Sequence, residues 1–321
     1  MMNVLFELAL MSSQPLALHG GGAGLTTLEA RAVARAGALA AGGQRISPAT
    51  QTTRSGSIAI IPIHGMITQR SGLLSALGLA TGCDQIRQAL TTAIADRSIS
   101  GIMLDIDSPG GCIYGIQELA DEIFKARSAK PIYAIANSLA ASAAYWIGAQ
   151  CSELYCTPSG QVGSIGVYIE HSDISQALAI NGQKVSIISA GRFKAEGNPY
   201  IPLDATARAA IQGNVDQYYS TFTKAVARGR GVPVARVRDG MGQGRCMQAK
   251  DAALSSMTDG IATLDQVITQ MQRPGASTSR TVATVQHSGL ARNDRLRLEL
   301  SGAKPVSHDS KRLALELAGE R

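Results

Sequence analysis

The sequence predicts an α/β fold in which a mostly parallel sheet carries helices on both faces. Between residues 57 and 228, apolar runs of strand length alternate with segments of helix length. A helix between two strands is the crossover connection that parallel pairing requires. With 321 residues, 45% of them hydrophobic, the chain is also long enough to bury a sizeable core.

Short apolar runs are the predicted strands. The run 58–63 is rich in isoleucine, whose branched side chain favours an extended backbone. The other predicted strands are 102–106, 131–136, 153–156 and 185–189. A turn is predicted at 108–111, because this segment reads Ser-Pro-Gly-Gly.

The predicted helices lie between these strands and after the last one. In the first of them Ile86, Leu90 and Ile94 recur at intervals of four, which places them on one helix face. The predicted helices are 83–95, 116–126, 142–149, 174–180 and 205–228.

Composition divides the chain into three parts. Residues 1–56 read as an N-terminal helical extension and a Gly/Ser/Thr-rich linker. Residues 57–274 form the predicted compact domain. Residues 275–321 are Ser/Thr-rich and then charged, which predicts a polar, flexible tail; the alternative is a docking segment for a partner.

Composition and charge exclude several classes of function. The net charge is +6, but no dense basic run is interleaved with aromatics, so nucleic-acid binding is not predicted. The apolar stretch 4–11 contains Glu7 and is far shorter than the roughly 20 residues of a membrane span. The five cysteines form no C-x-x-C pair, which predicts neither disulfides nor a zinc site. We therefore expect a soluble, cytoplasmic protein without a membrane partner or a metal.

Motifs for common cofactors are absent from the sequence. It contains no P-loop, no G-x-G-x-x-G and no H-E-x-x-H, so no cofactor is predicted. The G-x-S-x-G elbow of α/β-hydrolases is also missing, because Ala140 and Ala144 flank Ser142 where the glycines would stand.

The segment Ser-Pro-Gly-Gly is the first candidate site element. It follows a predicted strand, so Gly110 and Gly111 would lie at the carboxyl edge of a parallel sheet, where such folds bind ligands. Glycine permits backbone angles that direct N–H groups outward, as an oxyanion site requires. An ordinary tight turn would have the same sequence.

The second candidate element is Ser142, at a predicted strand–helix junction. The first-turn amides of the helix that starts there are free to bind negative charge. A serine there can also be a simple N-cap, and Ser138, four residues earlier, is an equal candidate on local grounds.

Two further segments follow in the chain. The small-residue turn 163–167 contains Ser164, and the segment 189–200 contains Lys194 next to Phe193. A lysine taken alone is most simply a surface residue.

Taken in order, the four segments SPGG, Ser142, GSIGV and GRFK resemble the signal peptide peptidase A (protease IV) family of serine peptidases. The resemblance is strongest to the capsid-assembly protease branch of tailed phages, on the segment KAEGNPY, and it spans residues 57–268. It implies a Clp/crotonase-like fold of stacked ββα units.

The resemblance also implies roles for the site residues. Ser142 would be the nucleophile and Lys194 the general base, with Ser164 hydrogen-bonded to the lysine amine. The backbone amides of Gly110 or Gly111, together with Ala143, would form the oxyanion hole. Such a dyad needs a neutral amine, and we expect Phe193 and the strand 185–189 to supply the apolar surroundings.

The resemblance further implies a homo-oligomer whose active sites can be shared between copies. Its expected substrates are scaffold or capsid proteins, and possibly the chain itself, during phage head assembly in the host cytoplasm or the prohead. The alternatives are a soluble bacterial peptidase of the same family that degrades peptides, an acyl-CoA enzyme of the crotonase type, or a shell or scaffold protein without proteolytic activity.

Overall fold

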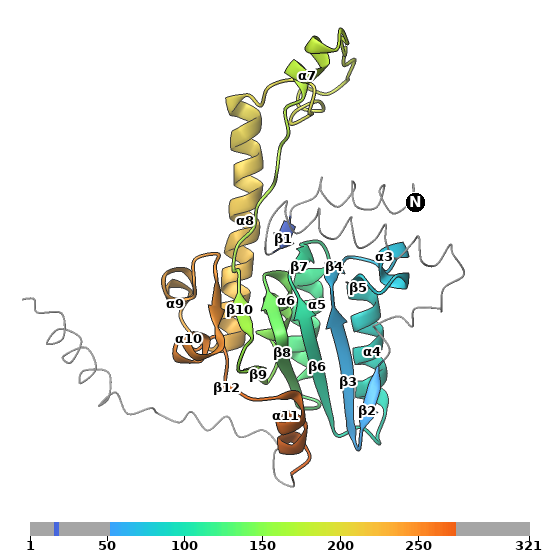
Figure 1. The fold of residues 1–321 in the computed structure, drawn as a ribbon, viewed down its shortest axis with the longest axis vertical. Coiled ribbons are helices and arrows are strands. Elements are labelled where there is room, and N and C mark those ends of the chain that lie inside the picture. The colour runs from blue at the N-terminus through green and yellow to red at the C-terminus, as the bar shows by residue number, and fades with distance from the viewer. Residues whose placement is uncertain (1–15, 19–51, 274–321) are drawn as a thin grey trace, which may run out of the picture. The chain divides into compact units, whose positions relative to one another are not determined.

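The computed structural model describes residues 16–18 and 52–273, and Figure 1 shows their arrangement. The helices expected at 4–11 and 26–41 and the tail at 275–321 lie outside these residues. Two strands fall where the sequence predicted an extension and a linker: β1 (Leu16–Leu18) and β2 (Thr53–Ser55).

An eight-stranded sheet forms the centre of the domain. Its main path runs β11-β10-β8-β6-β3-β2, and β9 pairs with both β8 and β12. The pairs β3–β6, β6–β8, β8–β9, β8–β10 and β9–β12 are parallel, whereas β2–β3 and β10–β11 are antiparallel. The bounds are β3 (Ile58–His64), β6 (Gly101–Ser108), β8 (Ile132–Ala141), β9 (Glu153–Cys156), β10 (Gln161–Gly163), β11 (Cys246–Gln248) and β12 (Gly260–Ile261). The predicted mostly parallel sheet is confirmed.

A second, four-stranded sheet continues from the carboxyl ends of β3 and β6. Its order is β1-β7-β4-β5, with β4 (Met66–Thr68), β5 (Ala80–Gly82) and β7 (Gly110–Cys112). The short helix α3 (Leu73–Ala76) joins β4 to β5. The turn predicted at 108–111 is therefore wrong in part: Ser108 ends β6, and both glycines lie in a strand because β4 and β1 pair with them.

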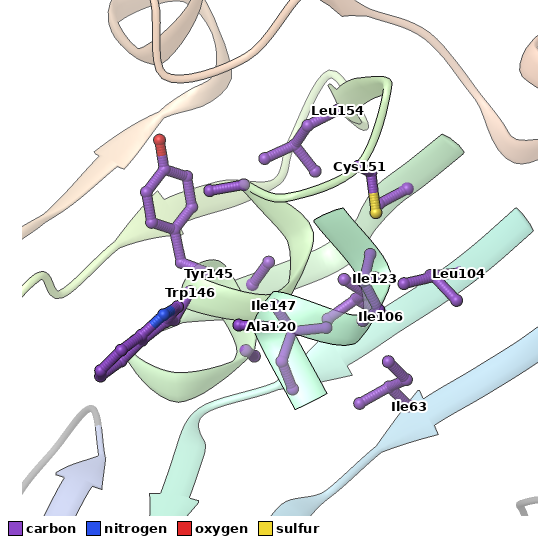
Figure 2. Packing of buried hydrophobic residues seen from close by; sticks show 14 of the residues in the cluster. Ile63, Leu104, Ile106, Ala120, Ile123, Tyr145, Trp146, Ile147, Cys151 and Leu154 are labelled. Atoms are coloured by element: carbon purple, nitrogen blue, oxygen red, sulfur yellow. The ribbon is translucent and has the colours of Figure 1, made fainter. Parts of the chain in front are cut away.

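Helices cover one face of the main sheet and build the larger core. They are α4 (Cys83–Ala95), α5 (Ile116–Ala126) and α6 (Ala143–Gly148), and the bounds of the first two are as predicted. Along β6, Leu104 and Ile106 point to this face and pack with Ile123 and Ile147, as Figure 2 shows. All four side chains are fully buried, so this core is complete within one copy of the chain.

A smaller core lies on the opposite face. Met103 and Ile135 pack there against Val267 and Ile268 of α11 (Leu264–Met271). Figure 1 shows α11 at the lower end of the sheet, on the side away from α5. Helices therefore lie on both faces, as the sequence predicted.

The long helix α8 (Ala205–Arg230) has two unlike halves. Its C-terminal half is anchored to α6, where the Phe222 and Trp146 rings stack with centroids 4.5 Å apart. The final residue, Arg230, is buried and forms a bidentate pair with the more exposed Asp259, at 2.7 and 2.9 Å. Asp259 also accepts from the Leu154 N–H, which ties the end of α8 to β9. The short helices α9 (Val234–Gly240) and α10 (Ala249–Leu254) follow.

Between β10 and α8 the chain forms what we call the arm, residues 166–204. Figure 1 shows it leaving β10, running along α8 and ending in α7 (Ser175–Ile180) beyond the N-terminal end of that helix. The strand predicted at 185–189 is wrong: these residues have no regular structure and are exposed. A strand needs a neighbour to pair with, and among the described residues none reaches this part of the arm.

In the described residues, no helix combines the length and the apolar character needed to cross a membrane.

Candidate active site

Ser142 occupies a sharp turn between β8 and α6. Its backbone angles are φ 55° and ψ −119°, a left-handed conformation that is strained for a residue with a side chain. The residue is buried (1% exposed), and within the described residues its Oγ has no hydrogen-bond partner. In strand–helix elbows, a strained turn of this kind positions the hydroxyl of a nucleophilic serine. A buried hydroxyl without a hydrogen-bond partner fits such a role.

The alternative serine is neither buried nor in a positive-φ conformation. Ser138 lies inside β8 and is exposed. The N-cap reading of Ser142 also fails in one respect, since its side chain makes no capping hydrogen bond to α6. Of the two serines, the backbone therefore favours Ser142 as the reactive one.

Main-chain contacts bring Ser164 next to Ser142. The parallel pairing of β8 with β10 sets Ala141 opposite Gly163, and the Ser142 N–H donates to the Gly163 carbonyl at 2.7 Å. Ser164 follows directly, is buried (7% exposed), and has a positive φ of 54° like Ser142. Two buried serines in strained conformations thus lie side by side at one edge of the sheet.

The two glycines of the oxyanion prediction lie in β7. Gly110 has φ 99°, and its N–H donates to the Ser108 Oγ at 3.1 Å. At Gly111 a Cβ atom would lie 2.0 Å from the Ile67 carbonyl oxygen, so only glycine allows β4 and β7 to approach this closely.

The third predicted donor is the N–H of Ala143, the first residue of α6. First-turn amides have no acceptor inside their own helix. Since β6 aligns Ser108 with Ala140 of β8, the chain that carries the glycines passes close to the turn that carries Ser142 and Ala143.

Lys194 lies elsewhere, on the arm. It is exposed, and three residues later Gly197 lies against Ile211 in the N-terminal half of α8. Ser142 is instead next to α6, which packs on Phe222, and 222 − 211 = 11 residues of helix span about 16 Å. One copy of the chain therefore brings Ser142, Ser164 and the glycines together but does not bring Lys194 to them.

Among the described residues of a single copy, the expected apolar surroundings of Lys194 are also absent. Phe193 is 53% exposed and Ile188 is 99% exposed. The projection of this segment from the domain was not predicted. The first half of α8 gave no signal of it, because Ala207, Ile211, Val215 and Tyr218 have the apolar spacing of an ordinary packed helix.

A polar cluster on the open part of the α11 face was also missed. His64 Nε2 lies 3.5 Å from Asp105 Oδ2, and the Asn137 amide donates to Asp105 Oδ1 at 3.1 Å. The hydrogen bond with Asp105 raises the pKa of His64. In the sequence the histidines are scattered single residues, and the carboxylate partner of His64 lies on a different strand.

Comparisons with known proteins match the part of the chain that carries this candidate site. Residues 125–277 match peptidase family S49, a range that contains Ser142, Ser164 and Lys194 but begins after the two glycines. The chain is 36% identical over 197 residues to the head-tail preconnector protein GP5 of Enterobacteria phage P21. It is 34% identical over 182 residues to the capsid assembly protease C of Escherichia phage lambda, and 26% identical over 220 residues to Protease 4 of Salmonella typhi.

These matches cover 61%, 57% and 68% of this chain and 39%, 42% and 35% of the respective relatives. The chain thus spans less than half the length of each. The α/β architecture with its parallel sheet fits the Clp/crotonase-like class that the resemblance implied. The comparisons therefore confirm the predicted resemblance to the signal peptide peptidase A (protease IV) family and its phage capsid-assembly branch, and the matching family is peptidase family S49.

Proposed function

We propose that the chain is a serine endopeptidase with a Ser–Lys dyad that two copies complete together. Ser142 of one copy is the nucleophile, and Lys194 on the arm of a neighbouring copy is the general base. The observation that carries the proposal is the pairing of two incomplete halves. One is a buried, strained serine without a hydrogen-bond partner, and the other is a lysine on an exposed apolar arm.

The arm has the surface expected of an interface. Eight of the twelve large apolar side chains that are exposed among the described residues lie between residues 174 and 201. Exposed apolar patches of this kind usually bind another protein surface. Burial of the arm against a neighbour would remove water from the Lys194 amine and so favour its neutral form.

The receiving copy has an open hollow next to the site. A depression of about 480 Å³ begins at Ile165, beside Ser164, and is bordered by Tyr219 and Arg238. A lysine side chain entering there would meet Ser164, the residue proposed to hold its amine.

In the proposed reaction the neutral Lys194 amine accepts the Ser142 hydroxyl proton as Oγ bonds to the peptide carbonyl carbon. The N–H of Ala143 and that of Gly110 or Gly111 stabilise the oxyanion. The Gly110 N–H can donate to the oxyanion only if its hydrogen bond to Ser108 Oγ breaks first. The C–N bond then breaks and the leaving amine takes the proton from Lys194. Water, activated by the same amine, hydrolyses the acyl-enzyme.

The proposed substrates are scaffold and capsid proteins during phage head assembly, and possibly this chain itself. This follows from the names of two relatives, a capsid assembly protease and a head-tail preconnector protein. The large or charged side chains that would restrict a site are absent from 140–144, which favours small or apolar substrate residues.

Mixing two inactive variants tests the shared site. Ser142→Ala and Lys194→Ala should each be inactive alone. When the two are co-assembled in equal amounts, about one interface in four combines an intact serine with an intact lysine and should recover that share of activity. Peptide hydrolysis after co-refolding measures this, and the matched control is each variant mixed with itself.

Failure of the mixture to recover activity would rule out sharing between copies. Undiminished hydrolysis by Ser142→Ala alone would overturn the assignment of Ser142 as the nucleophile and would make Ser138 the better candidate.

A further inference from the structure

The edge of β7 that carries the glycines is already occupied by a strand. Residues 16–18 pair antiparallel with β7, with Leu16 opposite Cys112, Ala17 opposite Gly111 and Leu18 opposite Gly110. The strand β1 therefore contacts the main chain of both glycines that are candidates for the oxyanion hole.

The sheet order shows which edge of β7 this is. β4 continues β3, β7 continues β6, and β4 pairs with β7 through Ile67 and Gly111. In the main sheet β6 lies between β3 and β8. Because β4 takes the edge on the β3 side, β1 takes the edge on the β8 side, where Ser142 ends the strand. Figure 1 shows β1 on this side of β7, above α6.

An extended peptide that presented its carbonyl to Ser142 would need this same edge. Proteins bind extended peptides by adding them as a strand to a sheet edge, with main-chain hydrogen bonds supplying the affinity. Glycines at 110 and 111 leave the backbone open to such a partner, since no side chain separates the two strands.

We propose that the β8-side edge of β7 is a binding site for an extended peptide strand and that Leu16–Leu18 is its resident occupant, a built-in pseudosubstrate. The proposal rests on the proposed peptidase function and adds regulation to it. A peptide substrate must displace β1 before it can reach Ser142.

The occupant is tethered, which strengthens its competition. Residues 19–51 connect β1 to the strand β2 of the same domain, so β1 is present at the high effective concentration of an intramolecular ligand. Only molecules in which β1 is displaced can bind a substrate. The apparent affinity for the substrate is therefore the intrinsic affinity multiplied by the fraction of such molecules.

Proline substitutions can release the strand without touching β7. Neighbouring residues of a strand direct their N–H groups to opposite sides, so Ala17→Pro/Leu18→Pro removes whichever of the two amides faces β7. The chain offers a matched control, because the same dipeptide recurs at Ala38 and Leu39. Both double variants are made in full-length Ser142→Ala protein to prevent cleavage.

Two measurements on these proteins do not depend on activity. Amide hydrogen exchange in peptides covering 108–113 should become about tenfold faster in Ala17→Pro/Leu18→Pro and remain unchanged in Ala38→Pro/Leu39→Pro. A fluorescent synthetic peptide with the sequence of residues 12–22 should bind about tenfold more tightly to the first variant than to the second.

A third measurement needs no substitution in β1. Saturating the Ser142→Ala protein with the same peptide should speed exchange at 16–18 while 108–113 stays protected. The pseudosubstrate proposal would be overturned if the two double variants had equal amide exchange at 108–113 and equal affinity for the peptide. It would also be overturned if saturation with the peptide left the exchange rate at 16–18 unchanged. The peptidase function is judged separately: failure of a fluorophosphonate to label Ser142 in wild-type protein and in otherwise wild-type Ala17→Pro/Leu18→Pro would overturn that function, whatever the exchange result.

Discussion

Apolar side chains have opposite environments in two regions of this molecule. Around α5 and α6, residues such as Ile123 and Ile147 are fully buried, whereas on the arm Ile180 is 85% exposed and Ile188 is 99% exposed. Both regions are rich in the same residue type. The first closes its core with helices of its own chain, and the second has no such cover among the described residues. This difference supports the proposal that the arm is half of an interface and that the lysine it carries is half of a site.

The largest expected effect is the loss of peptide hydrolysis when one proposed catalytic group is removed from either region. Ser142→Ala in the domain and Lys194→Ala on the arm should each lower peptide hydrolysis by about 10⁴-fold. The double variant should lose no more than either single one, since the two groups act as a unit. Steady-state hydrolysis measures all three, and circular dichroism checks that each is folded.

Additive losses would contradict this prediction, because they would mean that the serine and the lysine act independently.

A smaller effect compares one isoleucine from each region. Ile147→Ala should lower the free energy of unfolding by about 3 kcal/mol, because it leaves a cavity in a closed core. Ile188→Ala should change it by less than about 0.5 kcal/mol in unassembled protein. Urea unfolding at low protein concentration measures both. Similar losses at the two positions would show that the arm packs on its own domain.

The third effect concerns assembly. Ile188→Asp/Phe193→Asp places two charges on the arm, and burying them at an interface should weaken association about a hundredfold. Leu254→Asp is the matched control, because Leu254 is 73% exposed but lies on α10, away from the arm. Sedimentation velocity across a range of concentrations measures the change. An unaltered distribution of oligomers in the double variant would exclude the arm from the interface.

The same comparison explains which parts of the structure could be predicted from the sequence. The bounds of α4, α5 and β9 coincide with the predicted ranges, because their spacing of apolar residues and their packing partners belong to one chain. The run 185–189 has the composition of a strand but pairs with no other strand in the part of the chain that the structure describes, so composition alone misled the prediction.

The candidate site divides in the same way. Ser142 and Ser164 meet because β8 pairs with β10, a strand that was not predicted, so only the resemblance placed the two serines in one site. The distance of Lys194 from them could not be predicted, because a motif specifies a chemical role and not which copy supplies it. The position of β1 on β7 was missed as well, since Leu16–Leu18 is too short to stand out as a strand.

The smallest expected effect is a pH dependence of the free energy of unfolding of the domain, to which the arm does not contribute. The Asp105 hydrogen bond raises the pKa of His64 above its ordinary value of 6.5. Because the folded state holds this proton more tightly, the stabilisation is full below pH 6.5 and is lost as the pH rises through the folded pKa. For a partly exposed pair it amounts to about 0.5 kcal/mol. The stability advantage of wild type over His64→Asn should therefore be larger at pH 6 than at pH 8.5 in urea unfolding. Asp105→Asn should abolish that difference, and its persistence there would assign the pH dependence to another group.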